Sequence, residues 1–245
     1  MKKFFFVFFV LNFLRSKKRQ TFKNLNFRDI DFTNHQQIKS FIFKDSFHTL
    51  KNKHVQNFDF LNFSKRLGGK IGINLSKKTI FNWYSVNKNK LNYPWVEDLI
   101  SKRLINLLYN YEYVVSSSNN EEVVLLDKIV SVHIHRVNFD FNQKKISEIS
   151  GYDLLAFLLS CILLNKVDEN RIRQILFIIK SQIDNLGMHR SYNLLEHAKF
   201  INNMNEIRNI FLIYKINSVN EIENLIIKMT SILIQYFHDD GSLPL

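Results

Sequence analysis

Apolar residues recur every three or four positions along the C-terminal part of the chain, which is the period of one helix face. Three such stretches follow one another between Asp168 and Leu245. Their apolar positions are Ile172, Ile175, Leu176, Ile179 and Ile183 in the first, Leu194, Leu195, Ala198, Ile201, Ile207, Ile210, Phe211 and Tyr214 in the second, and Ile222, Leu225, Ile226, Met229, Ile232, Leu233 and Tyr236 in the third. We predict three helices that bury these faces against one another.

Three more helices are expected upstream. Pro94 suits the first position of a helix and opens an apolar pattern that runs to Leu108. A second pattern runs from Val123 to Ile134, and a third, from Tyr152 to Leu164, is apolar almost all round, so we expect it to be covered on most sides. Six helices with short connections predict stacked antiparallel helical hairpins from about residue 94 onward.

Residues 20–93 show no sustained helical period. Short alternating stretches at 71–75 and 79–84 predict extended segments or short strands, and Gly68-Gly69 predicts a break between them. The glycines there lack the spacing of a phosphate-binding loop, so we interpret them as a turn or bulge. This part is expected to be an irregular lead with short strands.

Residues 1–19 form a separate segment, in which an apolar run to Leu14 is followed by four basic residues among 15–19. The run is too short to span a bilayer as a helix. A signal, a peripheral membrane contact and a buried core segment all remain open for it.

The formal charge of +12 and the pI of about 9.6 raise nucleic acid or an anionic membrane as partners. However, lysine, asparagine, isoleucine and phenylalanine are abundant while alanine, glycine and proline are scarce, which is typical of an AT-rich genome and scatters charge without making a site. We therefore do not expect a nucleic-acid partner. Cys161, the single cysteine, excludes an internal disulfide. His133 and His135 have the wrong spacing for a helical metal pair, and we expect no metal or other cofactor.

Most polar chemistry lies in two breaks between the C-terminal helices, at 187–193 and 238–241. Gly187 is expected to end the preceding helix in a left-handed conformation. Asn193 and Glu196 have the spacing of a capping box for the next helix. These residues have two interpretations, as ordinary loop and cap structure or as substrate contacts.

The residues of several segments, and the order of these segments along the chain, resemble those of the N-terminal helical part of the heparinase II/III-like polysaccharide lyases. The resemblance covers roughly residues 80 to 245. It is carried by Phe81-Asn82-Trp83-Tyr84, Pro94-Trp95, the Arg-x-x-Asn of 101–106, Gln182-Ile183-Asp184, the Gly-x-His loop with its Arg-Ser and aromatic follow-on at 187–193, the helix 194–209, and His238-Asp239-Asp240-Gly241. One departure is the segment 138–143, where the family often has an Asn-His pair and this chain has no histidine after the asparagine.

This resemblance implies an incomplete (α/α) toroid over residues 94–245, with hairpins around a cleft and a β-sheet domain beyond. It implies binding of an acidic polysaccharide and β-elimination at a uronate, in the periplasm or cell envelope. Such elimination needs a proton-transfer group and a positive or amide group that neutralises the uronate carboxylate. The expected catalytic residues are His189 and Tyr192, and the expected substrate-binding residues are Arg190, Asn193, Arg103, Asn106, His238 and Asp240.

Two other classes stay open. The first is a glycan-binding or structural helical domain without catalysis, suggested by the missing Asn-His pair. The second is a basic helical protein associated with membrane or RNA, suggested by residues 1–19 and the net charge. For Arg103 and Asn106 an inter-helix hydrogen bond is the alternative to sugar binding, and for 238–241 a polar turn. The oligomeric state is undetermined by sequence.

Overall fold

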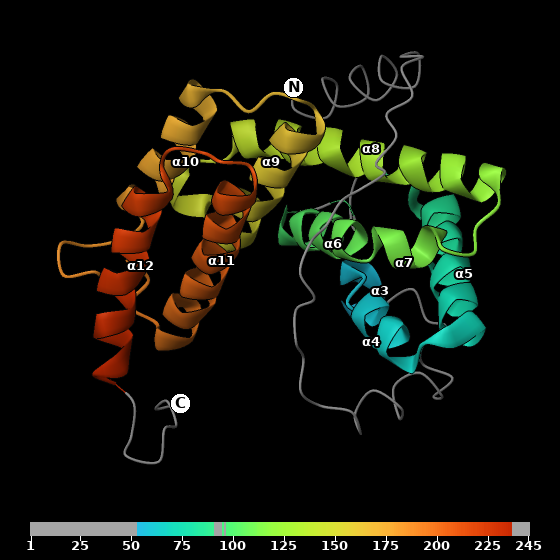
Figure 1. The fold of residues 1–245 in the computed structure, drawn as a ribbon, viewed down its shortest axis with the longest axis horizontal. Helices are drawn as coiled ribbons and strands as arrows, with labels where there is room; N and C mark the ends of the chain where they lie inside the picture. Colours follow the sequence, from blue (N-terminus) through green and yellow to red (C-terminus); the bar gives the residue numbers. More distant parts are fainter. Residues whose placement is uncertain (1–52, 91–94, 96, 237–245) are drawn as a thin grey trace. The chain divides into compact units, whose positions relative to one another are not determined.

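The computed structural model describes residues 53–90, 95 and 97–236 (Figure 1). Within these residues the chain is mainly α-helical, with one short 3-10 helix and no strand. The elements are α3 (Lys53–Asn57), α4 (Phe60–Leu67), α5 (Gly69–Asn87), α6 (Glu97–Tyr109), α7 (Tyr111–Val115), α8 (Asn120–Gln143), η2 (Ile146–Glu148), α9 (Gly151–Leu163), α10 (Glu169–Ser181), α11 (Leu194–Ile213) and α12 (Val219–Ile234). The prediction of a mainly α protein is confirmed.

The chain divides into two compact units, residues 1–135 and 136–245, and the division falls inside α8. The six helices predicted from residue 94 onward correspond to α6 and α8 to α12, and the structure adds the short α7 between the first two. Because each unit has its own core, we describe them one at a time.

The prediction of an irregular lead with short strands is wrong for residues 53–87, which form α3, α4 and α5. The buried positions of α5 include Gly72, Ser76, Ile80, Trp83 and Asn87, which follow a helical spacing but are mostly small or polar. An apolar period is therefore hard to see in this helix. Ile71, the first residue of the alternating stretch 71–75, is 80% exposed although it is apolar.

Gly72 allows α5 to approach α4 closely. A Cβ at this position would collide with the Ser64 carbonyl oxygen of α4 and with the Tyr113 hydroxyl of α7. That hydroxyl donates to the same Ser64 oxygen at 2.7 Å. Three helices thus meet at a point where only glycine fits.

The core of the first unit contains a fully buried arginine, Arg103 of α6. Its Nε donates to His133 Nε2 at 2.9 Å, and its Nη1 donates to the Gln56 carbonyl at 2.5 Å. Three aromatic rings surround the guanidinium carbon, with Trp83 at 4.2 Å, Trp95 at 5.4 Å and Phe58 at 5.7 Å from their ring centroids. We call these residues, with Arg103 and His133, the Arg103 cluster; cation–π contact and charged hydrogen bonds stabilise it.

His133 makes this cluster sensitive to acid. Its Nδ1 lies 2.8 Å from the Ile129 carbonyl, so Nδ1 carries the proton and Nε2 accepts from Arg103. Burial first, and the Arg103 charge second, lower the pKa of His133 to about 3. A histidine that is charged in the unfolded chain near pH 6.5 but neutral in the folded one makes stability rise with pH.

We therefore expect the first unit to lose stability as the pH falls from 6.5 toward 3. The chain has two tryptophans, Trp83 and Trp95, and both belong to the Arg103 cluster. Urea unfolding followed by tryptophan fluorescence at several pH values measures this dependence. In His133→Gln the free energy of unfolding should change less with pH between 6.5 and 4 than it does in the wild type. An equal change in both proteins would show that His133 is not the source of the acid sensitivity.

The second unit is built on α9, whose residues 153–162 are all buried, as the apolar pattern predicted. Ser150 caps its N-terminus by accepting from the Asp153 amide, and α11 packs against both α9 and α12. Gly151 lies against Asn203 of α11, where a Cβ would come within 2.7 Å of Asn203 Nδ2. Among the described helices, none is both long and apolar enough to cross a membrane.

Candidate functional site

The segment that joins α10 to α11, residues 182–193, contains the predicted His189 motif; we call it the His189 loop. Helix α10 ends at Ser181, six residues before Gly187, so the prediction that Gly187 caps this helix is wrong. Gly187 instead lies in a turn with a φ of 109°, where L side chains are strained. A Cβ there would lie 2.9 Å from Lys228 Cγ and 3.0 Å from the Lys228 carbonyl oxygen.

Asp184 organises the turn. One of its carboxylate oxygens, Oδ1, accepts from the backbone amides of Leu186, Gly187 and Met188 at 2.9, 2.9 and 2.8 Å. These three hydrogen bonds lower the pKa of Asp184, and the bond from the Met188 amide has the largest effect. The backbone closes around this carboxylate like a small hairpin, because Ile183 and His189 form an antiparallel bridge.

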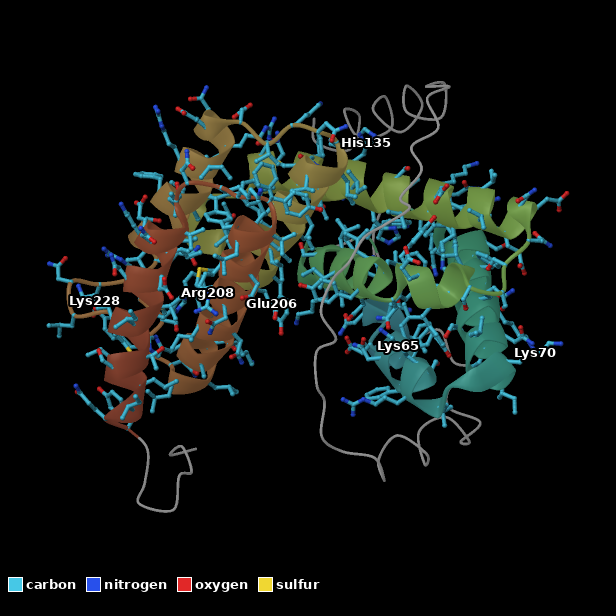
Figure 2. All side chains as sticks on the ribbon, viewed as in Figure 1. Lys65, Lys70, His135, Glu206, Arg208 and Lys228 are labelled. Carbon is cyan, nitrogen blue, oxygen red and sulfur yellow. The ribbon has the colours of Figure 1, made fainter. Side chains whose placement is uncertain are left out.

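Two neighbouring segments hold the loop from outside. The buried Gln182 side chain donates to the Ile146 carbonyl at 3.1 Å and to the Ile149 carbonyl at 2.5 Å. Lys228 of α12 reaches the loop (Figure 2) and donates from Nζ to the Asn185 carbonyl at 2.6 Å. The loop is therefore fixed to the segment before α9 and to α12. These contacts hold the loop backbone, and with it the side chains of the loop, in one arrangement.

His189 is half-buried, with its ring tilted against Phe200 at a centroid distance of 4.9 Å. Its Nδ1 lies 2.8 Å from the Ser191 hydroxyl and accepts from the Ser191 amide at 3.2 Å. Desolvation first, and then the charge of His197, lower the pKa of His189, against an opposing effect of Glu196. The imidazole is therefore neutral at pH 7, and its contacts within the described residues use Nδ1, so Nε2 remains for a ligand.

The three following predicted residues are exposed at the surface of the loop. Arg190 donates its amide to the Gln182 carbonyl at 2.9 Å, and its charge contributes to the lowered pKa of Asp184. Tyr192 is 70% exposed and has a φ of 51°, an uncommon value for a residue other than glycine. Asn193 caps α11, accepting the Glu196 amide on Oδ1 at 3.0 Å, so the amide-to-side-chain half of the predicted capping box is observed.

Two of the remaining predicted residues lie outside the unit that holds this loop. Arg103 and Asn106 lie inside the first unit, 0% and 8% exposed. Asn106 donates to the Asn57 carbonyl and to Asp59 Oδ1, both at 2.9 Å. These contacts are the inter-helix bonds of the alternative interpretation, and they leave neither side chain on the surface for a sugar. His238 and Asp240 lie outside the described residues.

The segment 138–143, where the family often has an Asn-His pair in a loop, is part of helix α8. Asn138 donates to the Ser160 hydroxyl at 2.7 Å, which ties α8 to α9. His133 belongs to the Arg103 cluster rather than to a metal site. Among the residues that the structure describes, no group of three histidines, cysteines or acids is placed to hold a metal ion.

Sequence reasoning named Gln182 and Asp184 only as part of the resemblance and not as supports of the loop, and it missed His197 and Lys228. An Asp three residues before a Gly is a turn signal, and this could have identified Asp184. His197 stands on the apolar face of α11 between Leu194 and Ile201, where a polar residue calls for a buried partner. Nothing in the local sequence identifies Lys228, because its contact with Asn185 spans 43 residues.

The loop thus carries the neutral imidazole of His189, the exposed guanidinium of Arg190 and the exposed phenol of Tyr192 on a backbone that several hydrogen bonds hold. Such a set suits the binding of an anion and the movement of a proton. Comparison with protein-family models, curated proteins and solved structures finds no significant match to this chain.

Proposed function

We propose that the chain is the N-terminal helical part of a heparinase II/III-like polysaccharide lyase, which binds an acidic glycan and supports β-elimination at a uronate. In this proposal α6 and α8 to α12 belong to an incomplete (α/α) toroid around a cleft, and a β-sheet domain completes the active site. The single observation that supports it best is the His189 loop, where a neutral histidine is held beside an exposed arginine.

Elimination removes the proton from the carbon beside the uronate carboxylate. The electron pair of that C–H bond forms a C=C bond, the neighbouring C–O bond breaks, and the departing sugar oxygen takes up a proton. The first proton is very weakly acidic unless the carboxylate charge is neutralised. A site for this reaction therefore needs a base, a carboxylate partner and a proton donor.

His189 can serve as a base because its lowered pKa keeps the imidazole neutral at pH 7 and its ring is held at Nδ1. Because Nδ1 accepts from the Ser191 amide, the neutral ring carries its proton on Nε2 in this arrangement and can donate it there. For Nε2 to act as the base, the ring proton must lie on Nδ1, where the Ser191 hydroxyl can accept it. We assign proton transfer to Nε2 of His189. The hydroxyl of Tyr192, in the same loop, is the second proton-transfer group.

Arg190 is the carboxylate partner in this proposal. Its planar guanidinium can donate two parallel hydrogen bonds to both oxygens of a carboxylate. Asn193 has its side-chain oxygen engaged in the cap of α11, so its contribution would come from the amide NH₂. Arg103 and Asn106 have no part in sugar binding in this proposal, since both side chains are buried.

The overall charge does not select the glycan by itself. Residues 136–236 contain twelve lysines and arginines against ten aspartates and glutamates, whereas residues 1–52 contain eleven against three. The excess of positive charge is thus concentrated outside the unit that holds the His189 loop. Recognition of a uronate here must come from particular groups, with Arg190 first among them.

Binding of a uronate polymer to the full chain tests the first half of the proposal. We expect Arg190→Gln to weaken binding about tenfold, the order of one charge-assisted bidentate contact. The control is Arg173→Gln, which removes an exposed arginine of α10 that pairs with Glu169 at 2.7 Å. The measurement is calorimetric titration with a uronate oligosaccharide at fixed ionic strength, with its neutral analogue as a second control.

Catalysis is tested by incubating the full-length protein with uronate polymers and following the absorbance of the unsaturated product. Specific binding without product would support the alternative of a glycan-binding domain. Equal binding of uronate and neutral sugars, or equal weakening by Arg190→Gln and Arg173→Gln, would overturn the assignment of the His189 loop. Binding that depends only on residues 1–19 would instead favour the membrane or RNA class.

A further inference from the structure

A second histidine, His197, lies directly beneath the His189 loop. It is in the first turn of α11 and is 0% exposed. Its Nε2 lies 2.9 Å from the Met229 carbonyl of α12, and its Nδ1 accepts from the backbone amide of His189 at 3.1 Å. The two ring nitrogens therefore have different partners on two different segments.

These partners define the tautomer of His197. A carbonyl oxygen can only accept, so Nε2 carries the proton and donates to Met229. Nδ1 is then a bare acceptor, which is what the His189 amide requires. The neutral imidazole satisfies both contacts at once, and neither a hydrocarbon ring nor a protonated imidazole does so.

The same face of α11 also supports the His189 ring. Phe200 follows His197 by three residues, so the two side chains are neighbours on the helix. His197 holds the backbone of His189 while Phe200 packs against its imidazole at 4.9 Å. Both the main chain and the side chain of His189 are thus held by consecutive turns of one helix.

We infer that His197 is a positioning residue for His189: it bridges α12 and the loop backbone, and so places the His189 imidazole for proton transfer. This inference rests on the proposed function for the catalytic meaning of the placement, but its geometry can be tested without substrate.

The test compares His197→Phe and His197→Gln in the full chain. Phenylalanine keeps the ring shape without either hydrogen bond, whereas glutamine keeps one acceptor and one donor on a flexible side chain. We expect at least a tenfold faster hydrogen exchange of the His189 amide in the phenylalanine variant, and a His189 titration midpoint closer to 6.5 by NMR. Glutamine should restore both values in part.

Two outcomes overturn the inference. The first is a folded phenylalanine variant in which the exchange of the His189 amide and the titration of its ring are unchanged. The second needs no variant and serves if His197→Phe does not fold: ¹⁵N NMR of the wild-type His197 ring showing protonated Nδ1 and bare Nε2. The expected spectrum has the opposite assignment.

The kinetic readout separates this inference from the proposed function. If the full-length protein eliminates uronates, His197→Phe should lower kcat with little change in KM, and glutamine should recover part of kcat, since a misplaced base affects the chemical step. If no elimination is found while the NMR results hold, the proposed function fails and the placement of His189 by His197 stands. If elimination is found and His197→Phe leaves both NMR readouts unchanged, the inference fails by itself.

Discussion

Replacing His189 with alanine is expected to lower the rate of the proposed uronate elimination by about 10²–10⁴-fold, the usual contribution of one general base. The imidazole has a lowered pKa, so it is neutral at pH 7, and it is half-buried against Phe200. The loop backbone should survive the change, because Asp184 and Gln182 hold it through contacts that do not involve the His189 side chain. The measurement is initial-rate absorbance of the unsaturated product.

The pH dependence of the wild-type rate adds an independent check. Because the pKa of His189 is lowered from 6.5, its neutral form persists below that pH, and the rate should fall only as the pH drops through the lowered value. The control is His135→Gln, at a histidine of the first unit (Figure 2). A rate in His189→Ala within threefold of wild type would remove this residue from the mechanism.

Helices α9, α10 and α12 of the second unit were predictable because their burial follows apolar residues, whereas α11 buries His197 and exposes the predicted Leu195. In α10, for example, Ile172, Ile175, Leu176 and Ile179 are all buried, as their spacing of three and four indicates. A similar pattern predicts α12 through Ile222, Ile226 and Met229. Where the buried face is apolar, period and structure agree.

Helix α5 shows why the rest of the fold was not predictable in the same way. Its buried face includes Gly72, Ser76, Lys77 and Asn87. Ser76 and Asn87 donate to carbonyls one turn earlier in the same helix, whereas the partners of Lys77 are distant in sequence. Lys77 donates to the Ser117 carbonyl at 3.0 Å and to Glu122 at 2.9 Å, forty residues and more away. Burial of polar groups through distant partners removes the apolar signal on which the prediction depends.

The site shows a similar division. The exposed groups of the His189 loop could be predicted because a polar break between helices displays its side chains. Its contacts with η2, α11 and α12 could not be predicted, because these elements are distant from the loop backbone groups they hold or show no local signal for the contact. Arg103 shows the opposite error: an arginine on a helix suggests a surface cation, yet the Arg103 cluster satisfies it inside the core through His133 and three aromatic rings.

Replacement of this buried arginine is expected to have a large effect on the stability of the first unit. Replacing Arg103 with leucine should lower the free energy of unfolding of the first unit by about 2–4 kcal/mol, from lost charged hydrogen bonds and a partly empty site. His133 Nε2 and the Gln56 carbonyl would lose their donor while remaining buried. Urea unfolding followed by tryptophan fluorescence measures the change, because Trp83 and Trp95 both contact the guanidinium.

Arg103→Lys distinguishes charge from geometry in this cluster. Lysine keeps the positive charge but lacks the planar fork that reaches His133 and Gln56 together, so its loss should lie between wild type and Arg103→Leu. Lys128→Met, at an exposed lysine of α8, is the surface control and should change stability by less than about 0.5 kcal/mol. If Arg103→Leu were as stable as wild type, the buried guanidinium would not be what holds α6 to its aromatic neighbours, and apolar packing would be sufficient.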